Sequence, residues 1–292
     1  MNHFEKVFRC FPLSVQQQIE GLPEEIRNTV EEIRVYRGKP VQIFAGGRRF
    51  ELCADIESGE IHGLLNNLMK FSYYAYEEDI AKGFITIDGG HRVGICGKAV
   101  VEKGRVTMLK DISSLNIRYS REIPGCSDSL LRYLIKPDGS LCNMLIISPP
   151  GCGKTTLLRD IARNLSMRDY KVAICDERSE IAGMASGVSP YTFGTMVDVL
   201  DGCPKAEGMR MLVRSMSPNV VIADEIGTED DAEAVKNCIF CGVSVVTTIH
   251  GASFEDLSKT DLFEMAEKHI FDYLVFLSDK PSAGTVKEVC RG

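Results

Sequence analysis

The residues with the clearest chemistry form the run Ser148-Pro149-Pro150-Gly151-Cys152-Gly153-Lys154-Thr155-Thr156, between an apolar stretch and a helical one. The two glycines let backbone N–H groups curl around a phosphate, and the start of the helix adds positive potential. Lys154 would place its charge between the β- and γ-phosphates, and the Thr155 hydroxyl would hold Mg²⁺. The run therefore predicts a phosphate-binding P-loop (Walker A) for ATP, with Ser148 at the position that is usually glycine.

A second motif follows further along the chain, where the apolar residues of Asn219–Ala223 lead into Asp224 and Glu225. A buried strand that delivers a carboxylate to its exposed end is the Walker B pattern. Asp224 would bind Mg²⁺ through water, and Glu225 would orient and deprotonate the attacking water. Since this motif comes after a P-loop, we predict an ATP-hydrolysing site.

Two more apolar stretches end in polar residues that could join this site. One leads into Asp176–Glu180, which contains Glu177 and Glu180, and the other ends at His250. In an open α/β sheet the ligand lies off the carboxyl ends of the strands, so these segments should converge on it. We expect Glu177 and Glu180 to be further catalytic carboxylates and His250 to contact the γ-phosphate.

The second half of the chain has the pattern of an α/β sheet. Nearly continuous apolar runs are typical of parallel strands buried on both faces, and helical stretches separate them. The predicted strands are 143–148, 171–176, 219–224, 243–248 and 273–277, and the predicted helices are 154–167, 207–216 and 229–241.

The first half predicts a smaller α+β domain, an antiparallel sheet with helices on one side. Helices are expected at 14–19, 23–33 and 61–82, and strands at 32–36, 41–44, 84–87, 92–96 and 106–109. We place this domain at 1–118, a hinge at 119–125 and the P-loop ATPase domain at 126–292, with a RecA/AAA-like core.

Composition and charge exclude several classes of protein. Of the 292 residues, 44 % are hydrophobic and 26 % charged, which is typical of a folded protein. No apolar run approaches the roughly 18 residues of a membrane span, and the charged N-terminus does not resemble a secretory signal, so a cytoplasmic protein is expected. The net charge of −7 and the lack of a basic block argue against nucleic acid as a partner. The scattered cysteines, including the C-x-x-C of Cys238 and Cys241, lack the second pair of a zinc site.

Beyond these motifs, the sequence resembles the type II/type IV secretion ATPases. The run 211–226, an arginine-containing helix that leads through a proline turn into the Walker B strand, is similar to theirs. Asp176–Glu180 resembles their Asp box, and 248–250 resembles their His box. The longer runs 198–209 and 148–156, together with 32–41 and 113–118, resemble a narrower family, the stage III sporulation AA proteins. These are cytosolic ATPases of the channel between mother cell and forespore in endospore-forming bacteria.

The resemblance implies a homo-oligomeric ring, a hexamer, that drives the membrane-embedded components of a sporulation channel. The protein would then lie at the membrane through a partner, without inserting into it. Secretion ATPases commonly have glycine where Asp224 stands, so it stays open whether Glu225, Glu177 or Glu180 polarises the water. An arginine should neutralise the γ-phosphate in the transition state, and the candidates are Arg118, Arg121, Arg210 and Arg214.

Two other functions are compatible with the same motifs. A nucleic-acid remodelling ATPase uses the same core, although the acidic ATPase half argues against it. A nucleotide-gated scaffold would bind ATP with little turnover, although the intact Asp224-Glu225 pair argues against that.

Overall fold

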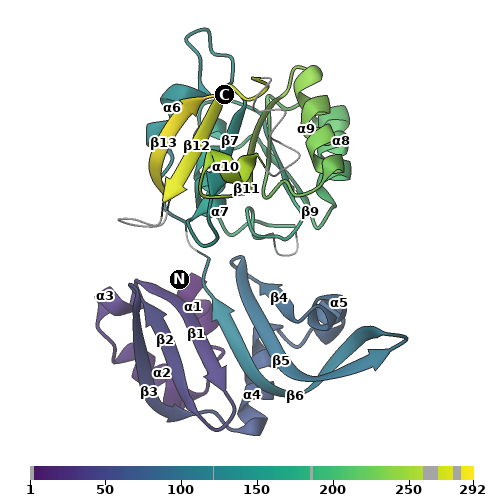
Figure 1. The fold of residues 1–292 in the computed structure, drawn as a ribbon. Helices are drawn as coiled ribbons and strands as arrows, with labels where there is room; N and C mark the ends of the chain where they lie inside the picture. The colour runs from purple at the N-terminus through teal and green to yellow at the C-terminus, as the bar shows by residue number, and fades with distance from the viewer. Residues whose placement is uncertain (1–2, 121, 185–186, 259–268, 279–283) are drawn as a thin grey trace. The chain divides into compact units, whose positions relative to one another are not determined.

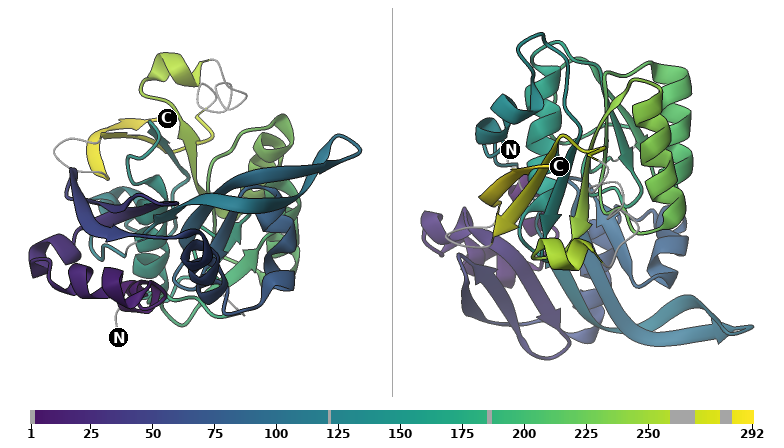
Figure 2. Two further views of the ribbon diagram at one scale, coloured as in Figure 1. Left: turned by 90° about the horizontal axis from the view of Figure 1, so that it is seen from below. Right: turned by 45° about the horizontal axis from the view of Figure 1, so that its top comes forward.

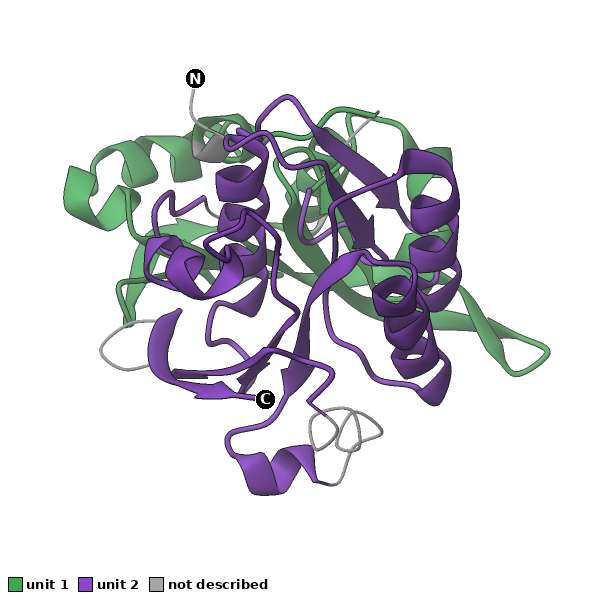
Figure 3. Ribbon diagram, turned by 90° about the horizontal axis from the view of Figure 1, so that it is seen from above, with its two compact units in different colours: residues 1–120, 183–190 green, residues 121–182, 191–292 purple. Residues whose placement is uncertain are grey.

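The computed structural model describes residues 3–120, 122–184, 187–258, 269–278 and 284–292. The chain divides into two compact units (Figures 1 and 3). Unit 1 consists of residues 1–120 and 183–190, and unit 2 consists of residues 121–182 and 191–292. Each unit has its own sheet and its own core.

Unit 1 is built on a six-stranded antiparallel sheet with the order β3-β2-β1-β6-β5-β4. Its strands are β1 (Val30–Tyr36), β2 (Pro40–Ala45), β3 (Arg48–Asp55), β4 (Phe84–Ile87), β5 (His91–Glu102) and β6 (Arg105–Arg118). Its helices are α1 (His3–Phe8), α2 (Leu13–Glu20), α3 (Glu24–Arg27), α4 (Ser58–Leu68), α5 (Glu77–Ala81) and the short 3-10 helix η1 (Tyr73–Tyr76).

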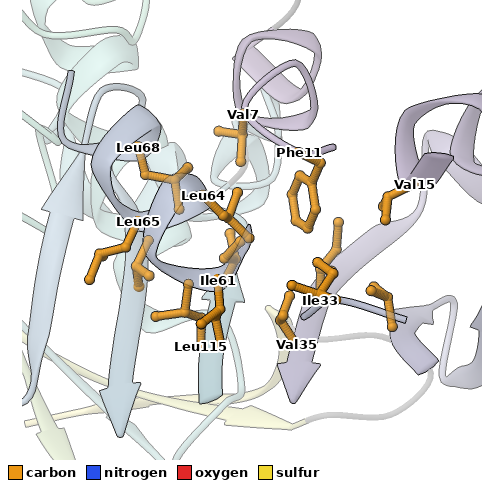
Figure 4. Close-up of a cluster of buried hydrophobic side chains, with 14 of the residues drawn as sticks. Val7, Phe11, Val15, Ile33, Val35, Ile61, Leu64, Leu65, Leu68 and Leu115 are labelled. Atoms are coloured by element: carbon orange, nitrogen blue, oxygen red, sulfur yellow. The ribbon is translucent and has the colours of Figure 1, made fainter. Parts of the chain in front are cut away.

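Alternating side chains give this sheet one apolar and one polar face, as the sequence predicts. On β1, Ile33 and Val35 are fully buried, whereas Arg34 between them is only partly buried. Apolar side chains from α1, α2 and α4 pack on the inner face, where Phe11, Leu64 and Leu115 belong to one buried cluster (Figure 4). On the polar face the guanidinium group of Arg92 stacks 3.8 Å from the ring centre of Phe84. A helix layer on one side of an antiparallel sheet is the α+β arrangement that the sequence predicts.

Two helix predictions in this unit are wrong. The helix expected at 61–82 is interrupted, because Lys70 and Phe71 adopt positive φ angles of 51° and 59° that no α-helix contains. The helix expected at 23–33 ends at Arg27, and Val30 already lies in β1. In both places tertiary pairing and packing override the local helical pattern.

Strands β5 and β6 continue past the rest of their sheet as a two-stranded ribbon (Figures 1 and 2). The pairing of β5 with β4 stops at Gly94, and that of β6 with β1 stops at Ser114. A bulge starts the ribbon at Gly97, where a Cβ atom would lie 2.5 Å from the carbonyl oxygen of Lys110. At the far end, Lys103 and Gly104 have φ angles of 48° and 78°, as in a type I′ hairpin turn.

Unit 2 is built on a seven-stranded sheet with the order β13-β12-β7-β11-β10-β8-β9, in which all neighbours are parallel except β12 and β13. Its strands are β7 (Met144–Ser148), β8 (Val172–Asp176), β9 (Val197–Asp201), β10 (Val220–Ala223), β11 (Ser244–His250), β12 (Tyr273–Ser278) and β13 (Thr285–Arg291). Its helices are α6 (Asp128–Leu134), α7 (Lys154–Ser166), α8 (Lys205–Met216), α9 (Glu229–Phe240) and α10 (Phe254–Leu257).

Both faces of this sheet are covered, which explains the unbroken apolar runs. Neighbouring residues of β7 point to opposite cores: Leu145 packs with residues of α8 and α9, and Ile146 packs with residues of α6 and α7. Helices on both faces of a largely parallel sheet, with the run Ser148–Thr156 between β7 and α7, confirm the predicted α/β core. None of the helices in the described ranges is long and apolar enough to cross a membrane.

Candidate active site

The P-loop joins β7 to α7, and two of its glycines make the turn. Gly151 and Gly153 have φ angles of 76° and 82°, which other residues resist. Gly153 is the N-cap of α7, and no side chain of the described chain caps this helix start. The first N–H groups of a helix need partners, so this helix start can donate to a phosphate. Pro150 and Gly151 are exposed at the tip, whereas Cys152 is buried beneath it.

Lys154 lies buried at the base of the loop, with 6 % of its surface exposed. Its ammonium group donates to the carbonyl oxygens of Ser148 and Pro149 at 3.1 and 3.2 Å and lies 3.1 Å from Nδ1 of His250. An ammonium group has three hydrogens, so all three are used. Burial lowers the pKa of Lys154, against the opposing effect of the Glu225 and Asp224 carboxylates. A phosphate would give this desolvated cation a charged partner in place of carbonyl groups.

Thr155 and Asp224 meet at the end of β10. The Thr155 hydroxyl donates to Oδ2 of Asp224 at 2.8 Å, and the buried Thr248 hydroxyl donates to the other oxygen, Oδ1. Hydroxyl and carboxylate oxygens are the ligands that Mg²⁺ takes from P-loop proteins, with phosphate and water completing the shell. Thr155 and Asp224 therefore fit a shared magnesium ion.

Glu225 lies between a histidine and an arginine. Its Oε1 lies 2.9 Å from Nε2 of His250, and its Oε2 accepts from Nη1 of Arg178 at 2.9 Å. Because Lys154 can only donate and a carboxylate only accept, His250 accepts at Nδ1 and donates at Nε2. A continuous hydrogen-bond chain thus runs from the P-loop lysine through His250 to Glu225 and on to Arg178.

The backbone at Glu225 is held in an uncommon conformation. Its φ angle is 49°, which is sparsely populated by residues with a side chain. Two bonds to Thr248 of β11 support it: the Glu225 N–H donates to the Thr248 hydroxyl, and the Ile226 N–H donates to the Thr248 carbonyl, both at 2.9 Å. The neighbouring strand therefore fixes the direction of the Glu225 side chain.

A small hollow beside Glu225 collects the polar residues that follow β8. It is lined by Asp176, Glu177, Arg178, Glu180, Lys205, Asp224 and Glu225. Glu177 pairs with the buried Lys205 at 2.6 Å. Glu180 also lines the hollow. The ends of β8, β10 and β11 and the P-loop therefore lie together at one sheet edge, as predicted. The roles of the individual carboxylates remain predictions.

The turn after β8 is stabilised from within and from α7. The buried Asp176 carboxylate accepts from the N–H groups of Glu180 and Ala182 at 2.9 and 2.8 Å, and burial raises its pKa. Arg159 of α7 is 2 % exposed and donates to the carbonyl oxygens of Ile181 and Glu180, both at 2.7 Å. Its guanidinium group also stacks 3.8 Å from the ring centre of Tyr191.

The structure describes three of the four arginines predicted to face the γ-phosphate, and their role stays a prediction. Arg210 pairs with Asp230, and Arg214 is exposed in the last turn of α8. Arg118 is exposed at the end of β6 in unit 1, and Arg121 lies outside the described residues. Sequence reasoning missed Arg178, although the segment that contains it was singled out for its carboxylates. It gave no role to Thr248, although 248–250 resembles the His box, and none to Arg159 or Lys205.

A family model described as "Sporulation stage III, protein AA" matches residues 1–291. The chain belongs to this family. It is 42 % identical over 290 residues to the stage III sporulation protein AA of Bacillus subtilis (strain 168), covering 97 % of this chain and 94 % of that protein. The resemblance stated from the sequence is thereby confirmed.

Solved structures show the same fold at low sequence identity. The ATPase DotB of Legionella pneumophila has a TM-score of 0.58 at 17 % identity, over 89 % of this chain and 73 % of that one. The pilus retraction motor PilT with bound ADP has a TM-score of 0.59 at 15 % identity, over 91 % and 77 %. This family member therefore shares its fold with DotB and PilT.

Proposed function

We propose that the protein binds ATP with Mg²⁺, hydrolyses it and acts as the motor of a sporulation secretion channel. The observation that carries the proposal is the convergence of Lys154, Thr155, Asp224 and Glu225 at one sheet edge. The names of the similar structures, an ATPase and a motor with bound ADP, support the nucleotide and the use of its energy. The family supports the link to sporulation.

Each residue of the site has a defined task in this proposal. The P-loop N–H groups bind phosphate oxygens, and Lys154 exchanges its carbonyl partners for them. Thr155 and Asp224 hold Mg²⁺, which neutralises phosphate charge when bound. Glu225 orients the attacking water and accepts its proton, and His250 links Lys154 to Glu225. Glu177 and Glu180 hold the polar edge of the hollow.

The larger assembly is also part of the proposal. We infer a homo-oligomeric ring, a hexamer, that works on the cytoplasmic side of the membrane through a channel partner. ATP turnover in such a ring would be converted into movement of units or subunits.

The direct test is steady-state ATP hydrolysis by the wild type, Lys154→Ala and Glu225→Gln, with oligomer mass measured with and without ATP. We expect both variants to lose turnover by about 10³-fold or more, because each removes a group that acts on the reacting phosphate. Lys154→Ala should also lose ATP affinity, whereas Glu225→Gln should still bind ATP and assemble.

Two matched controls separate chemistry from surface charge. Lys171→Ala and Glu207→Gln change exposed residues of unit 2 and should keep wild-type turnover. A wild type that binds ATP and assembles without hydrolysing it would contradict the motor and favour a nucleotide-gated scaffold. A wild type that binds no nucleotide would contradict the whole proposal.

A further inference from the structure

The proposed reaction needs a positive charge at the γ-phosphate, and the hollow contains an arginine that can supply it. Charge builds up on the γ-phosphoryl oxygens in the transition state, and an arginine stabilises it. Arg178 lines the hollow together with Asp224 and Glu225. Within the described residues of unit 2, the arginines expected from the sequence lie on α8, where Arg210 is paired with Asp230 and Arg214 is exposed.

The guanidinium group of Arg178 is close to the reacting groups but is not locked in place. It donates to Glu225 at 2.9 Å, and His250 links Glu225 to Lys154 of the P-loop. Its side chain is 55 % exposed, so it can change partner without breaking a packed core. A phosphate carries more negative charge than a carboxylate and accepts the same bidentate fork.

The backbone around Arg178 is fixed on both sides. Asp176 accepts from the N–H groups of Glu180 and Ala182, and the Ser179 hydroxyl donates to Asp201 at 2.7 Å. Ser179 itself has a φ angle of 54°, a conformation that such bonds must maintain. The backbone of Arg178 is therefore fixed, whereas its exposed guanidinium group can change partner. Such an arrangement suits a side chain that must reach a bound phosphate in a defined position.

Arg159 connects the turn that carries Arg178 to the helix that follows the P-loop. It lies on α7, five positions after Lys154, and its two bonds to the carbonyl groups of Glu180 and Ile181 join the helix to the turn. Because α7 begins in the P-loop, the turn that carries Arg178 and the loop that would hold the phosphates are held together. Arg159 is a positioning residue in this scheme.

We propose that Arg178 contacts the γ-phosphate of ATP bound to the same chain, exchanging Glu225 for the phosphate oxygens. This inference rests on the proposed ATPase function. Release from Arg178 frees the Glu225 carboxylate to accept a proton from water while the water oxygen bonds to the γ-phosphorus. The bond from that phosphorus to the bridging oxygen of ADP breaks, and Arg178 stabilises the oxygens without bonding covalently.

The first test compares Arg178→Ala and Arg178→Lys with Arg291→Ala, which changes an exposed arginine at the end of β13. We expect Arg178→Ala to lower kcat by about 10³-fold or more and Arg178→Lys to recover part of it, since arginines of this kind contribute about 10³–10⁵-fold. Arg291→Ala should behave as the wild type. An Arg178→Ala enzyme with wild-type kcat would overturn the inference.

Binding provides a readout that does not depend on turnover. ADP with aluminium fluoride imitates the transferring γ-phosphate, whereas ADP alone lacks that group. Arg178→Ala should weaken binding of the aluminium fluoride complex by about 10-fold or more and leave ADP binding unchanged. Equal losses for both ligands would overturn the inference and indicate a merely structural role. If wild-type protein binds neither ligand, the proposed function itself fails.

Mixed assemblies test whether the arginine acts within its own chain. Lys154→Ala subunits retain Arg178, and Arg178→Ala subunits retain the P-loop lysine. If Arg178 serves its own chain, mixing the two in co-assembled oligomers should give no more turnover than the sum of the separate variants. Recovered turnover on mixing would show that Arg178 reaches a neighbour's site, which would overturn the same-chain assignment.

Discussion

The sheets of the two units differ in how successive residues of a strand are buried. In β1 of unit 1, the buried Ile33 is followed by the partly exposed Arg34, whereas in β7 of unit 2 the neighbours Leu145 and Ile146 are both fully buried. A strand covered on one face can carry polar groups along its whole length. A strand covered on both faces can carry them only at its ends, so the polar groups of unit 2 collect at one sheet edge. The location of the candidate site follows from this difference.

The largest effect should come from truncating adjacent strand residues in both units. We expect Leu145→Ala, Ile146→Ala and Ile33→Ala each to lower the free energy of unfolding by about 2–5 kcal/mol, because each leaves a cavity. Arg34→Ala should change it by less than about 1 kcal/mol, since it removes a partly exposed ion pair. Urea unfolding, with hydrogen exchange to assign each transition to a unit, measures both. Equal losses for Ile33→Ala and Arg34→Ala would contradict the one-faced sheet of unit 1.

A smaller effect, dependent on pH, is expected at a buried carboxylate of unit 2. Asp160 is 3 % exposed, and burial raises its pKa. Bonds from the Ser127 N–H and hydroxyl, from Arg163 and from the Gly125 N–H outweigh burial, so the net shift is downward. A pKa below the unfolded value stabilises the fold above about pH 4, and this stabilisation is lost as the pH falls further.

Asp160→Asn should therefore destabilise unit 2 by about 2–3 kcal/mol at pH 7. The difference from the wild type should shrink as the pH falls below about 4. The control is Glu32→Gln on the polar face of unit 1, which should stay within about 0.5 kcal/mol of the wild type. Thermal unfolding between pH 3 and pH 7 measures both, and a difference that is independent of pH would contradict the role of the Asp160 charge.

The smallest effects should be alike in the two units, because they come from helix ends. Thr228 caps α9 in a capping box with Asp231. At the start of α4, the Glu60 carboxylate accepts a hydrogen bond from the Glu57 N–H at 2.9 Å. Thr228→Ala should lower stability by about 1 kcal/mol and Glu60→Ala by about 0.5 kcal/mol. Chemical unfolding measures both losses of stability. Small losses in both variants would support our expectation that the two units differ in their sheets and not in their helix ends.

Much of unit 2 could be predicted from the sequence because its strands are unbroken apolar runs and its P-loop has a strict local form. The five predicted strands and the helices α7, α8 and α9 lie within a few residues of their expected positions. The edge strands β9 and β13 were not predicted. In β9 two aspartates interrupt the apolar residues, and β13 pairs only along one side, so neither has the pattern of a buried strand.

The unpredicted parts of the site depend on contacts between distant segments. The Thr248 hydroxyl donates to the Asp224 carboxylate and accepts from the Glu225 N–H, just after β10. Arg159 of α7 reaches the turn after β8. No residue spacing in the sequence predicts either contact, because both form only when the sheet brings separate strand ends together. In unit 1 the broken helix at Lys70 and Phe71 was missed for a related reason, since the local pattern is helical and packing decides otherwise.

The ribbon of β5 and β6 has a practical consequence. Beyond Gly97 it has only its own two strands for support within the described sheet, and Val101 near its tip is 59 % exposed. A lone pair of strands is only marginally stable in water, so its amide hydrogens should exchange with solvent ahead of those in the six-stranded part. The Lys103-Gly104 turn is therefore a natural attachment point for a fluorophore or an affinity tag, where an insertion would leave the core of unit 1 undisturbed.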